Sequence, residues 1–304
     1  GNAFTPRPGM MIGLDFTQQY ILKLGIIFLG IRLSFADFIK FGSIAIPLII
    51  ICILGVLILI KLLIKKVPIS SKMSYLIAIG TSVCGATAIV ATAPVINAKK
   101  SEVAYAIANI TLFGVIAMLI YPYFAEWYFD NEALKAGLFL GTSIHETSQV
   151  AAAGLIYDQQ FNSPETLNVA TVTKLIRNTF LVILIPLFAF LYNRGELKGQ
   201  KYSILSIFPY FVLGFIGMII LRNLGDQFFS IENNNIYIWS KFIEYLKVLT
   251  TVFLTMAMAA VGISINLSEL KSMGYKPFIV GLIAATTVGI ISLIYIETLK
   301  NFFV

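Results

Sequence analysis

Residues 141–150 are Gly141-Thr142-Ser143-Ile144-His145-Glu146-Thr147-Ser148-Gln149-Val150, and they lie between two apolar segments, 133–140 and 151–156. The combined segment is about long enough to cross a bilayer, or to dip to its middle and return. Its centre holds the only histidine of the chain, a glutamate, a glutamine and four hydroxyl side chains. Polar and ionisable groups at that depth are costly, so they indicate a transport or ion site. The alternative is a solvated loop between two short helices of a soluble protein.

The composition argues against a soluble protein. Of the 304 residues, 58% are hydrophobic and 12% are charged, with a mean hydropathy of +0.88, whereas roughly a quarter of a soluble domain is charged. The net charge of +7 does not indicate nucleic-acid binding, because the basic residues cluster at the ends of apolar segments, as the positive-inside rule expects. Cys52 and Cys84 lie in apolar runs without disulfide or zinc-ligand spacing. We therefore predict a multi-pass membrane protein with no metal site and no cofactor.

Nine apolar segments predict an all-α polytopic membrane protein, with one transmembrane transporter domain over residues 1–304. The segments are 20–35, 44–64, 73–96, 103–123, 133–157, 167–192, 204–221, 245–265 and 278–296. Gly80, Gly85 and Pro94 interrupt the third segment and residues 141–150 interrupt the fifth, so each is predicted to be a broken or re-entrant helix. The longest predicted loop is 223–241. The chain starts at Gly1, and we expect one or more further membrane segments before it.

Two internal similarities are typical of transporters built from inverted repeats. Stretches 30–42 and 262–274 both start with glycine, have an acidic residue seven positions on and end in glycine. Residues 80–84, Gly-Thr-Ser-Val-Cys, match residues 141–145, Gly-Thr-Ser-Ile-His. Chance is the alternative for either match alone. The third and fifth segments are inverted mates only if each re-enters, which puts Lys99 and Lys100 inside and the acidic loops around the fifth segment outside.

A broken helix leaves its first backbone N–H groups free, with a partial positive charge at that end. Thr81-Ser82 and Thr142-Ser143 are suitable N-cap residues for half-helices that begin there. Two such ends meeting at the middle of the membrane would bind an oxyanion. The predicted contributors are Thr81, Ser82, Thr87, Thr142, Ser143, Thr147, Ser148 and Gln149. The alternative is that these hydroxyl groups bond to their own helix or to a neighbouring one.

Lys174 and Arg177 are three residues apart, so they share one face of the helix predicted over 167–192. Arg177 lies too deep for easy snorkelling, and a buried charge needs a partner. We predict Glu146 as the partner of one cation, which leaves the other for an anionic solute. The alternative is that the helix extends beyond the membrane and both cations lie among the headgroups. Either Glu146 or His145 could take up a proton coupled to transport, and the alternative for His145 is a packing role.

Enzymatic motifs fit the sequence poorly. His145-Glu146 lacks the second histidine of the zinc-protease helix motif. Residues 80–84 lack the final glycine of the nucleophile elbow, and a Gly-rich phosphate loop is missing from the sequence. We therefore expect no enzymatic activity and no catalytic residue.

Several motifs resemble those of the YeiH-type family of bacterial inner-membrane proteins, whose members are labelled sulfate exporters. The motifs are residues 80–88 with Ala93-Pro94-Val95, residues 141–150, residues 24–26 with 30–33, residues 255–260, and Lys174-Leu175-Ile176-Arg177-Asn178. The resemblance spans nearly the whole chain. It implies a relative of cation/proton antiporters and bile-acid-type symporters, in which a core moves against a scaffold. The core elements would be 73–100, 133–157 and 167–192, with Cys84, His145 and Asn178 added to the solute-binding residues.

The chain departs from this family at two places in the predicted site. Family members often have Asp where this chain has Glu146, which keeps the carboxylate but moves it by one methylene. They often have a second Gly or Ser where this chain has Ala86-Thr87, which bears on the size of the site. The identity of the solute is therefore the least direct implication of the resemblance.

The motifs together predict a secondary transporter of a small anion, namely sulfate, a sulfonate or a carboxylate, across the bacterial inner membrane. Transport could be coupled to H⁺ or Na⁺, and the protein could form a homodimer. One alternative is a cation/proton antiporter that uses Glu146. Another is a membrane receptor or scaffold that transports nothing.

Overall fold

The computed structural model describes residues 8–63, 69–93, 95–192, 210–230, 236–264 and 275–298. Every regular element within these ranges is a helix, which confirms the all-α prediction. The first elements are α1 (Pro8–Phe16), η1 (Thr17–Ile21), α2 (Leu22–Leu29), η2 (Gly30–Arg32), α3 (Phe35–Leu63), α4 (Ser71–Ser82), α5 (Ala86–Thr92) and α6 (Lys100–Phe129). They are followed by α7 (Ala133–Ser143), α8 (Thr147–Phe161), α9 (Pro164–Thr179), α10 (Leu181–Tyr192), α12 (Phe211–Ser230), α13 (Ile236–Ser264) and α15 (Tyr275–Thr298).

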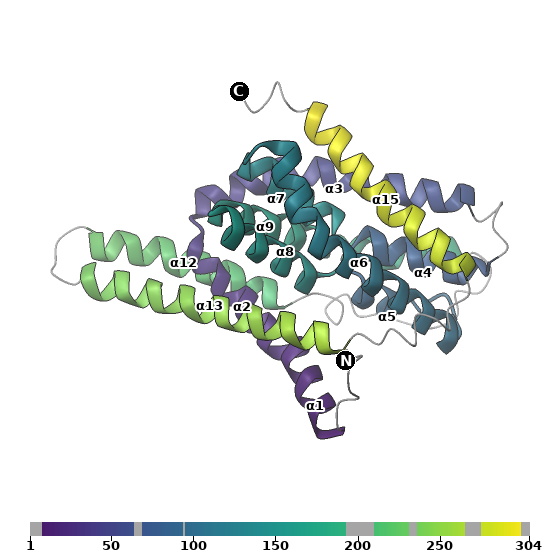
Figure 1. Cartoon of the computed structure of the whole chain (residues 1–304), viewed down its shortest axis with the longest axis horizontal. Coiled ribbons are helices and arrows are strands. Elements are labelled where there is room, and N and C mark those ends of the chain that lie inside the picture. Colours follow the sequence, from purple (N-terminus) through teal and green to yellow (C-terminus); the bar gives the residue numbers. More distant parts are fainter. Residues whose placement is uncertain are drawn as a thin grey trace.

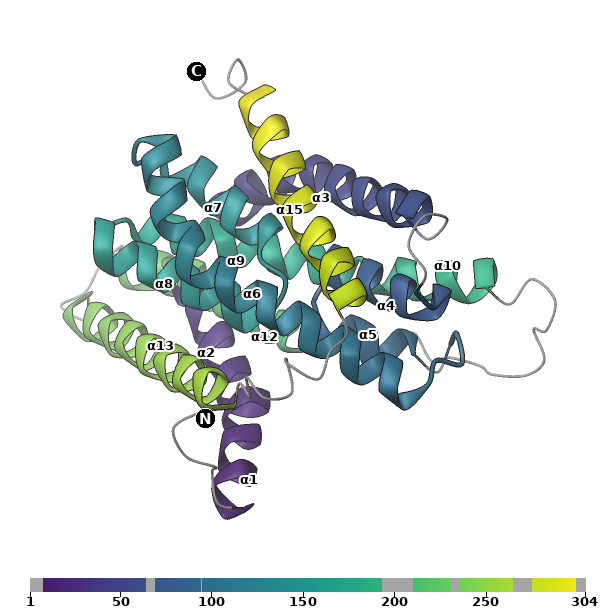
Figure 2. The same ribbon diagram turned by 45° about the vertical axis from the view of Figure 1, so that its right-hand side comes forward.

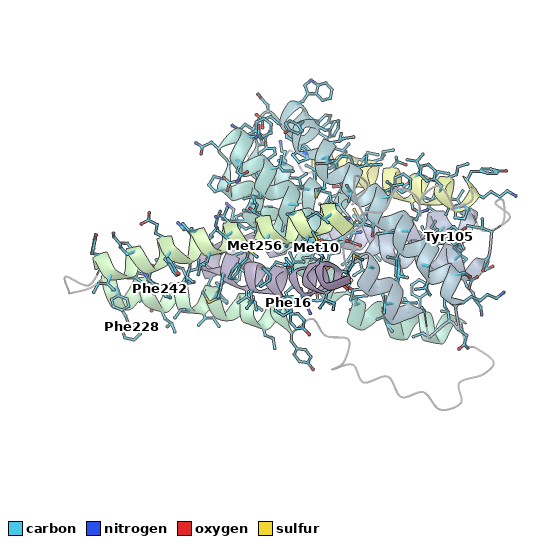
Figure 3. All side chains as sticks on the ribbon, turned by 60° about the horizontal axis from the view of Figure 1, so that its bottom comes forward. Met10, Phe16, Tyr105, Phe228, Phe242 and Met256 are labelled. Carbon is cyan, nitrogen blue, oxygen red and sulfur yellow. The ribbon has the colours of Figure 1, made fainter. Side chains whose placement is uncertain are left out.

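The outer surface of the protein is strongly apolar. Large side chains such as Phe16, Phe228 and Met256 are exposed (Figure 3), and apolar exposure of this extent suits lipid rather than water. Among the described residues, the spans that are long and apolar enough to cross a membrane are Phe38–Leu63, Ser101–Phe129, Pro164–Ile185 and Tyr275–Thr298. The structure thus supports a membrane protein with four candidate spans, fewer than the nine segments predicted from the sequence.

The third and fifth apolar segments are both interrupted, as predicted. The first ends as α4 at Ser82 and resumes as α5 at Ala86, and the second ends as α7 at Ser143 and resumes as α8 at Thr147. In both, the helix ends two residues after the glycine that opens the shared motif, and three residues separate one end from the next start. The two similar motifs therefore share a helix–break–helix pattern, although the backbone differs within the breaks: Gly85 has φ +70°, whereas Glu146 at the corresponding position has φ −101°.

Other boundaries differ from the prediction. The predicted helix over 167–192 divides at Phe180 into α9 and α10. The predicted loop 223–241 is wrong, because α12 continues to Ser230 and α13 already begins at Ile236. Asp226 of this stretch bonds within α12 and across to α13: its carboxylate accepts from Arg222 Nε (2.6 Å) on α12 and from Trp239 Nε1 (2.8 Å) on α13. The first internal similarity joins stretches 30–42 and 262–274. In the first stretch, Gly30–Arg32 forms the 3₁₀ turn η2. In the second stretch, residues 265–274 lie outside the described residues.

The helices pack in two groups. We call α1, η1, α2, η2, α12 and α13 the panel, because these elements pack mainly on one another and form the lower-left part of Figure 1. We call α3 to α10 with α15 the bundle, in which α9 packs against α7, α8 and α3 while α15 lies across α3, α4 and α7 (Figure 2). The main cluster of buried apolar side chains extends through the bundle and reaches α2 and α12. The three predicted core elements all lie in the bundle.

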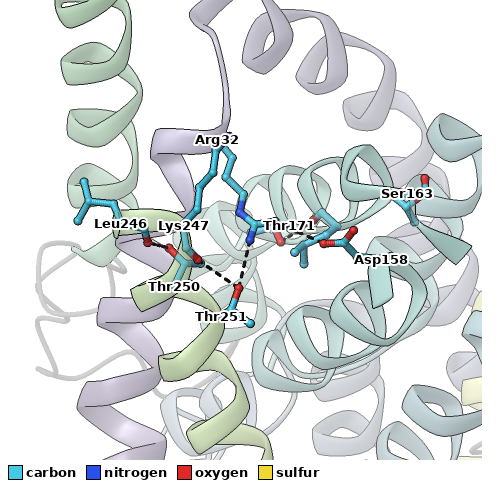
Figure 4. Close-up of polar contacts among 10 residues, drawn as sticks. Arg32, Asp158, Ser163, Thr171, Leu246, Lys247, Thr250 and Thr251 are labelled. Atoms are coloured by element: carbon cyan, nitrogen blue, oxygen red, sulfur yellow. Dashed lines mark hydrogen bonds and ion pairs between the residues drawn. The ribbon is translucent and has the colours of Figure 1, made fainter. Parts of the chain in front are cut away.

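Arg32, the last residue of η2, joins the panel to the bundle. Its Nη1 lies 3.4 Å from Asp158 Oδ2 on α8, and its Nη2 donates to Thr251 Oγ1 on α13 at 3.2 Å (Figure 4). Both side chains of the ion pair are largely buried, at 12% and 19% exposure. One guanidinium therefore contacts both helix groups near the C-terminal end of α8.

Candidate functional site

Lys174 on α9 lies between the two helix breaks. Its Nζ donates to the carbonyl oxygens of Val83 (2.8 Å) and Ile144 (3.0 Å), and also to that of His145. An ammonium group has three N–H donors, so the two breaks satisfy all of them. Because one nitrogen contacts both breaks, the breaks meet, as the sequence predicted.

Arg177 lies one turn further along α9 and donates hydrogen bonds to the backbone carbonyls at the ends of α4 and α7. Its Nε donates to the Ser82 carbonyl (2.8 Å), and its Nη1 donates to those of Thr142 (2.5 Å) and Ile144 (3.4 Å). Its Nη2 donates to the Thr81 carbonyl. The side chains of Lys174 and Arg177 are both 0% exposed. The last carbonyls of a helix have no partner within the helix and carry a partial negative charge, so these two cations stabilise the ends of α4 and α7.

Two predictions about these residues are therefore wrong. Thr81-Ser82 and Thr142-Ser143 do not begin half-helices: they end α4 and α7, and Arg177 bonds to the carbonyl groups of Thr81, Ser82 and Thr142. Glu146 is not the ion-pair partner of either cation, since the ion pairs of the described residues are Arg32–Asp158, Lys135–Glu132 and Arg222–Asp226. The carbonyl groups supply the compensation that we had assigned to a carboxylate.

Glu146 lies on the opposite side of the breaks, at the amide ends of the second half-helices. It is the N-cap residue of α8: its carboxylate accepts from the Gln149 backbone N–H, while its own N–H donates to Gln149 Oε1 at 3.2 Å. The carboxylate also accepts from the Ala86 backbone N–H in the first turn of α5 and from Thr111 Oγ1 on α6 at 3.2 Å. One carboxylate thus satisfies the amide ends of both α5 and α8.

Two glycines make this geometry possible. Gly85, just before α5, has φ +70°, a conformation that other residues rarely adopt. A Cβ atom there would lie 2.5 Å from Glu146 Cγ. A Cβ atom on Gly141 would lie 2.7 Å from the Ala170 carbonyl oxygen, so this glycine lets α7 approach α9 closely. Both residues belong to the motifs that the sequence singled out.

A cavity of about 320 Å³ opens beside Glu146, between the panel and the bundle. On the bundle side it is lined by both breaks and by the first residues of α5 and α8, namely Cys84, Ala86, Thr87, Glu146, Thr147 and Ser148. On the panel side it is lined by Leu22, Lys23, Ile26 and Phe211. Lys23 is an exposed residue that lines the cavity, so it lies at the open side.

Comparison with known proteins identifies the family. The family model described as "Conserved hypothetical protein 698" matches residues 1–281. A UPF0324 membrane protein of Streptococcus agalactiae is 37% identical over 292 residues, covering 96% of this chain and 83% of its own. The chain belongs to the UPF0324 family of membrane proteins.

Two further UPF0324 proteins extend the comparison. The relative from Fusobacterium nucleatum is 35% identical over 92% of this chain and 82% of its own. The UPF0324 inner membrane protein YeiH of Escherichia coli is 33% identical over 89% of this chain and 74% of its own. These relatives confirm the YeiH-type resemblance and the inner-membrane location. No solved structure matches the chain.

In this UPF0324 chain, five of the predicted site residues line the cavity: Cys84, Thr87, Glu146, Thr147 and Ser148. The others lie behind it. Thr142 Oγ1 bonds to the Leu138 carbonyl and to Ser292 Oγ on α15, both at 2.7 Å. Gln149 Nε2 donates to the Thr111 carbonyl at 3.3 Å, and Asn178 Nδ2 donates to Thr147 Oγ1 at 3.0 Å. Buried residues that do not line the cavity are Thr81, Ser82, Ser143, His145, Lys174 and Arg177.

The sequence analysis missed the panel side of the cavity. Lys23 was the available signal, because it is one of two basic residues, with Arg32, within the apolar segment 20–35. Phe211 carried no signal, since apolar residues are expected throughout a membrane helix, and Ile26 entered only as part of the family motif 24–26, without a predicted role. Among the described residues, the structure contains no cluster of three or more metal-ligating side chains.

Proposed function

We propose that this UPF0324 protein is a secondary transporter of small anions and not an enzyme. One observation carries the proposal: the cavity lies between two packing groups and ends at the amide ends of two broken helices. Broken helices whose ends face a site between repeats are the usual solute and ion sites of secondary transporters. The proposal includes nine membrane segments, arranged as inverted repeats with the two breaks near the middle of the bilayer.

The charges around the cavity favour an anion. Lys23 and Glu146 line it, and Lys174 and Arg177 lie directly behind the breaks. The formal balance is three basic side chains against one acidic side chain. The hydrogen bonds of Lys174 and Arg177 are used by carbonyl groups, but a helix end carries only about half a charge. The field of these cations therefore still reaches the cavity, where the dielectric constant is low.

Glu146 supplies a reason for proton coupling. Its carboxylate occupies the amide groups that would otherwise attract a solute anion. Two negative groups at one site repel each other strongly where water is scarce. A proton on Glu146 would remove the repulsion and release the amides, so solute and proton would enter together. His145 does not line the cavity, and we assign the coupling to Glu146.

Flux into proteoliposomes tests this function. Labelled sulfate, methanesulfonate and acetate are offered to the wild-type chain with and without an imposed pH gradient. We expect uptake of at least one anion that follows the pH gradient in the wild type. In Glu146→Gln we expect anion movement that no longer responds to pH. Glu165→Gln, an exposed position in the first turn of α9, is the matched control and should behave as the wild type.

A cation/proton antiporter remains the second candidate, because Glu146 is the acidic side chain that lines this cavity in the part of the chain that the structure describes. It predicts movement of Na⁺ or K⁺ against protons, abolished in Glu146→Gln and indifferent to the anion present. A receptor or scaffold predicts no flux of any solute. Either result would contradict anion transport.

A further inference from the structure

The cavity beside Glu146 has one polar and one apolar wall. The polar wall carries the hydroxyl groups of Thr87, Thr147 and Ser148 with the Glu146 carboxylate, and Lys23 lies at the open side. The apolar wall is formed by Leu22 and Ile26 of α2 and by Phe211 of α12. A fully hydrated inorganic ion gains nothing from an apolar wall, because such a wall cannot replace its hydration. A solute that fits both walls has an anionic end and a hydrocarbon end.

The size of the cavity agrees with such a solute. Its volume is about 320 Å³, at the lower limit of pockets that bind organic ligands of roughly 300 to 1,000 Å³. One water molecule takes about 30 Å³, so the cavity is much larger than a single tetrahedral oxyanion needs.

The charges favour a singly charged head. Among the described residues, the cavity lining offers one cation, Lys23, and one carboxylate, Glu146. With Glu146 protonated as the solute enters, Lys23 can pair fully with a singly charged head, whereas a divalent anion would keep one negative charge that no described lining residue pairs. This argument separates organic monoanions from inorganic sulfate.

We propose that the solute is a small organic monoanion, a sulfonate or carboxylate whose short alkyl chain packs against Leu22, Ile26 and Phe211 while Lys23 binds its head. This inference rests on the proposed anion transport and specifies its substrate class. It also makes the panel a part of the binding site, because Lys23 and Phe211 both belong to panel helices.

A homologous series tests the apolar wall. The full chain is titrated with linear sulfonates from methanesulfonate to hexanesulfonate, with the matching carboxylates and with inorganic sulfate, and binding is followed by the ligand-induced rise in melting temperature. Each buried methylene should tighten binding about fourfold, until the chain extends beyond Phe211. Sulfate should bind more weakly than butanesulfonate. If both series show the chain-length gain, the comparison of the two reports which head group is preferred.

Matched variants assign the two ends of the solute. Phe211→Ala should remove the chain-length gain and leave methanesulfonate binding unchanged, whereas Phe228→Ala on the same helix, 79% exposed, should change nothing. Phe211→Leu should keep most of the gain. Lys23→Gln should weaken every member of the series about tenfold, as expected for a lost charged hydrogen bond, and Lys40→Gln on α3 serves as its control.

The outcomes separate the substrate class from the function. Tight binding and flux of sulfate, with no gain from longer chains, would overturn the substrate class and leave anion transport standing. An unchanged series in both Lys23→Gln and Phe211→Ala would also overturn it. Binding and flux of no anion at all would overturn both.

Discussion

Lys174 and Arg177 face the carbonyl ends of α4 and α7, whereas Glu146 faces the amide ends of α5 and α8. The two sides use the same physics with opposite sign, because cations stabilise helix C-termini and anions stabilise helix N-termini. They differ in surroundings. The cations are sealed inside the bundle, and the carboxylate lines a cavity. We call the ends of α4 and α7 with Lys174 and Arg177 the carbonyl side, and the starts of α5 and α8 with Glu146 the amide side. We infer that the carbonyl side holds the two breaks together and that the amide side binds and releases solute.

The largest effect is expected on the carbonyl side. Arg177→Met would leave the carbonyls of Thr81, Ser82 and Thr142 without this donor, while the Ile144 carbonyl keeps Lys174. Each unsatisfied buried polar group costs about 1 to 3 kcal/mol. We expect a loss of at least about 3 kcal/mol in the free energy of unfolding, measured by denaturation in detergent. Arg222→Met, which breaks a partly exposed pair, is the control. An Arg177→Met protein as stable as the wild type would refute the structural role of Arg177.

A smaller effect is expected at the amide side, where the first break meets Glu146. Gly85→Ala places a side chain at φ +70° and against Glu146 Cγ, and backbone strain of this kind costs about 1 to 3 kcal/mol. The same denaturation assay measures it. Gly217→Ala on α12, where a Cβ atom would meet nothing within 4 Å, should be neutral or slightly stabilising. Equal stability of the two variants would mean that the first break does not need this glycine.

The smallest effect on stability is expected away from both sides of the breaks, at the contact between the groups. Arg32 and Asp158 form a largely buried but long pair at 3.4 Å, and pairs of this kind contribute about 1 kcal/mol or less when they retain access to water. A double-mutant cycle with Arg32→Gln and Asp158→Asn should give a coupling energy in this range. The same variants should alter flux if the panel moves against the bundle. A coupling energy above about 3 kcal/mol would mean that this contact contributes as much to the free energy of unfolding as Arg177 does, which would contradict the expected order of effects.

The sequence predicted where the helices break but not which helix ends face which charge. Serine and threonine are good N-cap residues, yet inside a helix they can also bond back to the preceding turn. Thr142 does so, through the Leu138 carbonyl. The motif alone therefore cannot say whether a helix begins or ends there. The capping glutamate three residues before Gln149 was the better signal for the start of α8.

The partners of Lys174 and Arg177 were beyond sequence reasoning for a related reason. Their burial was predicted correctly, but backbone carbonyls are present at every position and carry no sequence signature. A carboxylate nearby in the pattern, Glu146, looked like the partner. The panel side of the cavity was missed because Lys23 and Phe211 reach it through packing of α2 and α12, and periodicity within one helix says nothing about such long-range contacts.

The division between the two sides is tested most directly by the ligand-induced rise in melting temperature, followed against pH in Arg177→Lys and Glu146→Gln. Butanesulfonate serves as the ligand. We predict that Arg177→Lys melts below the wild type without ligand and keeps the pH-dependent rise. We predict that Glu146→Gln melts close to the wild type and shows a rise that no longer varies with pH. The opposite pattern, a rise lost in Arg177→Lys and an unchanged pH dependence in Glu146→Gln, would contradict the account.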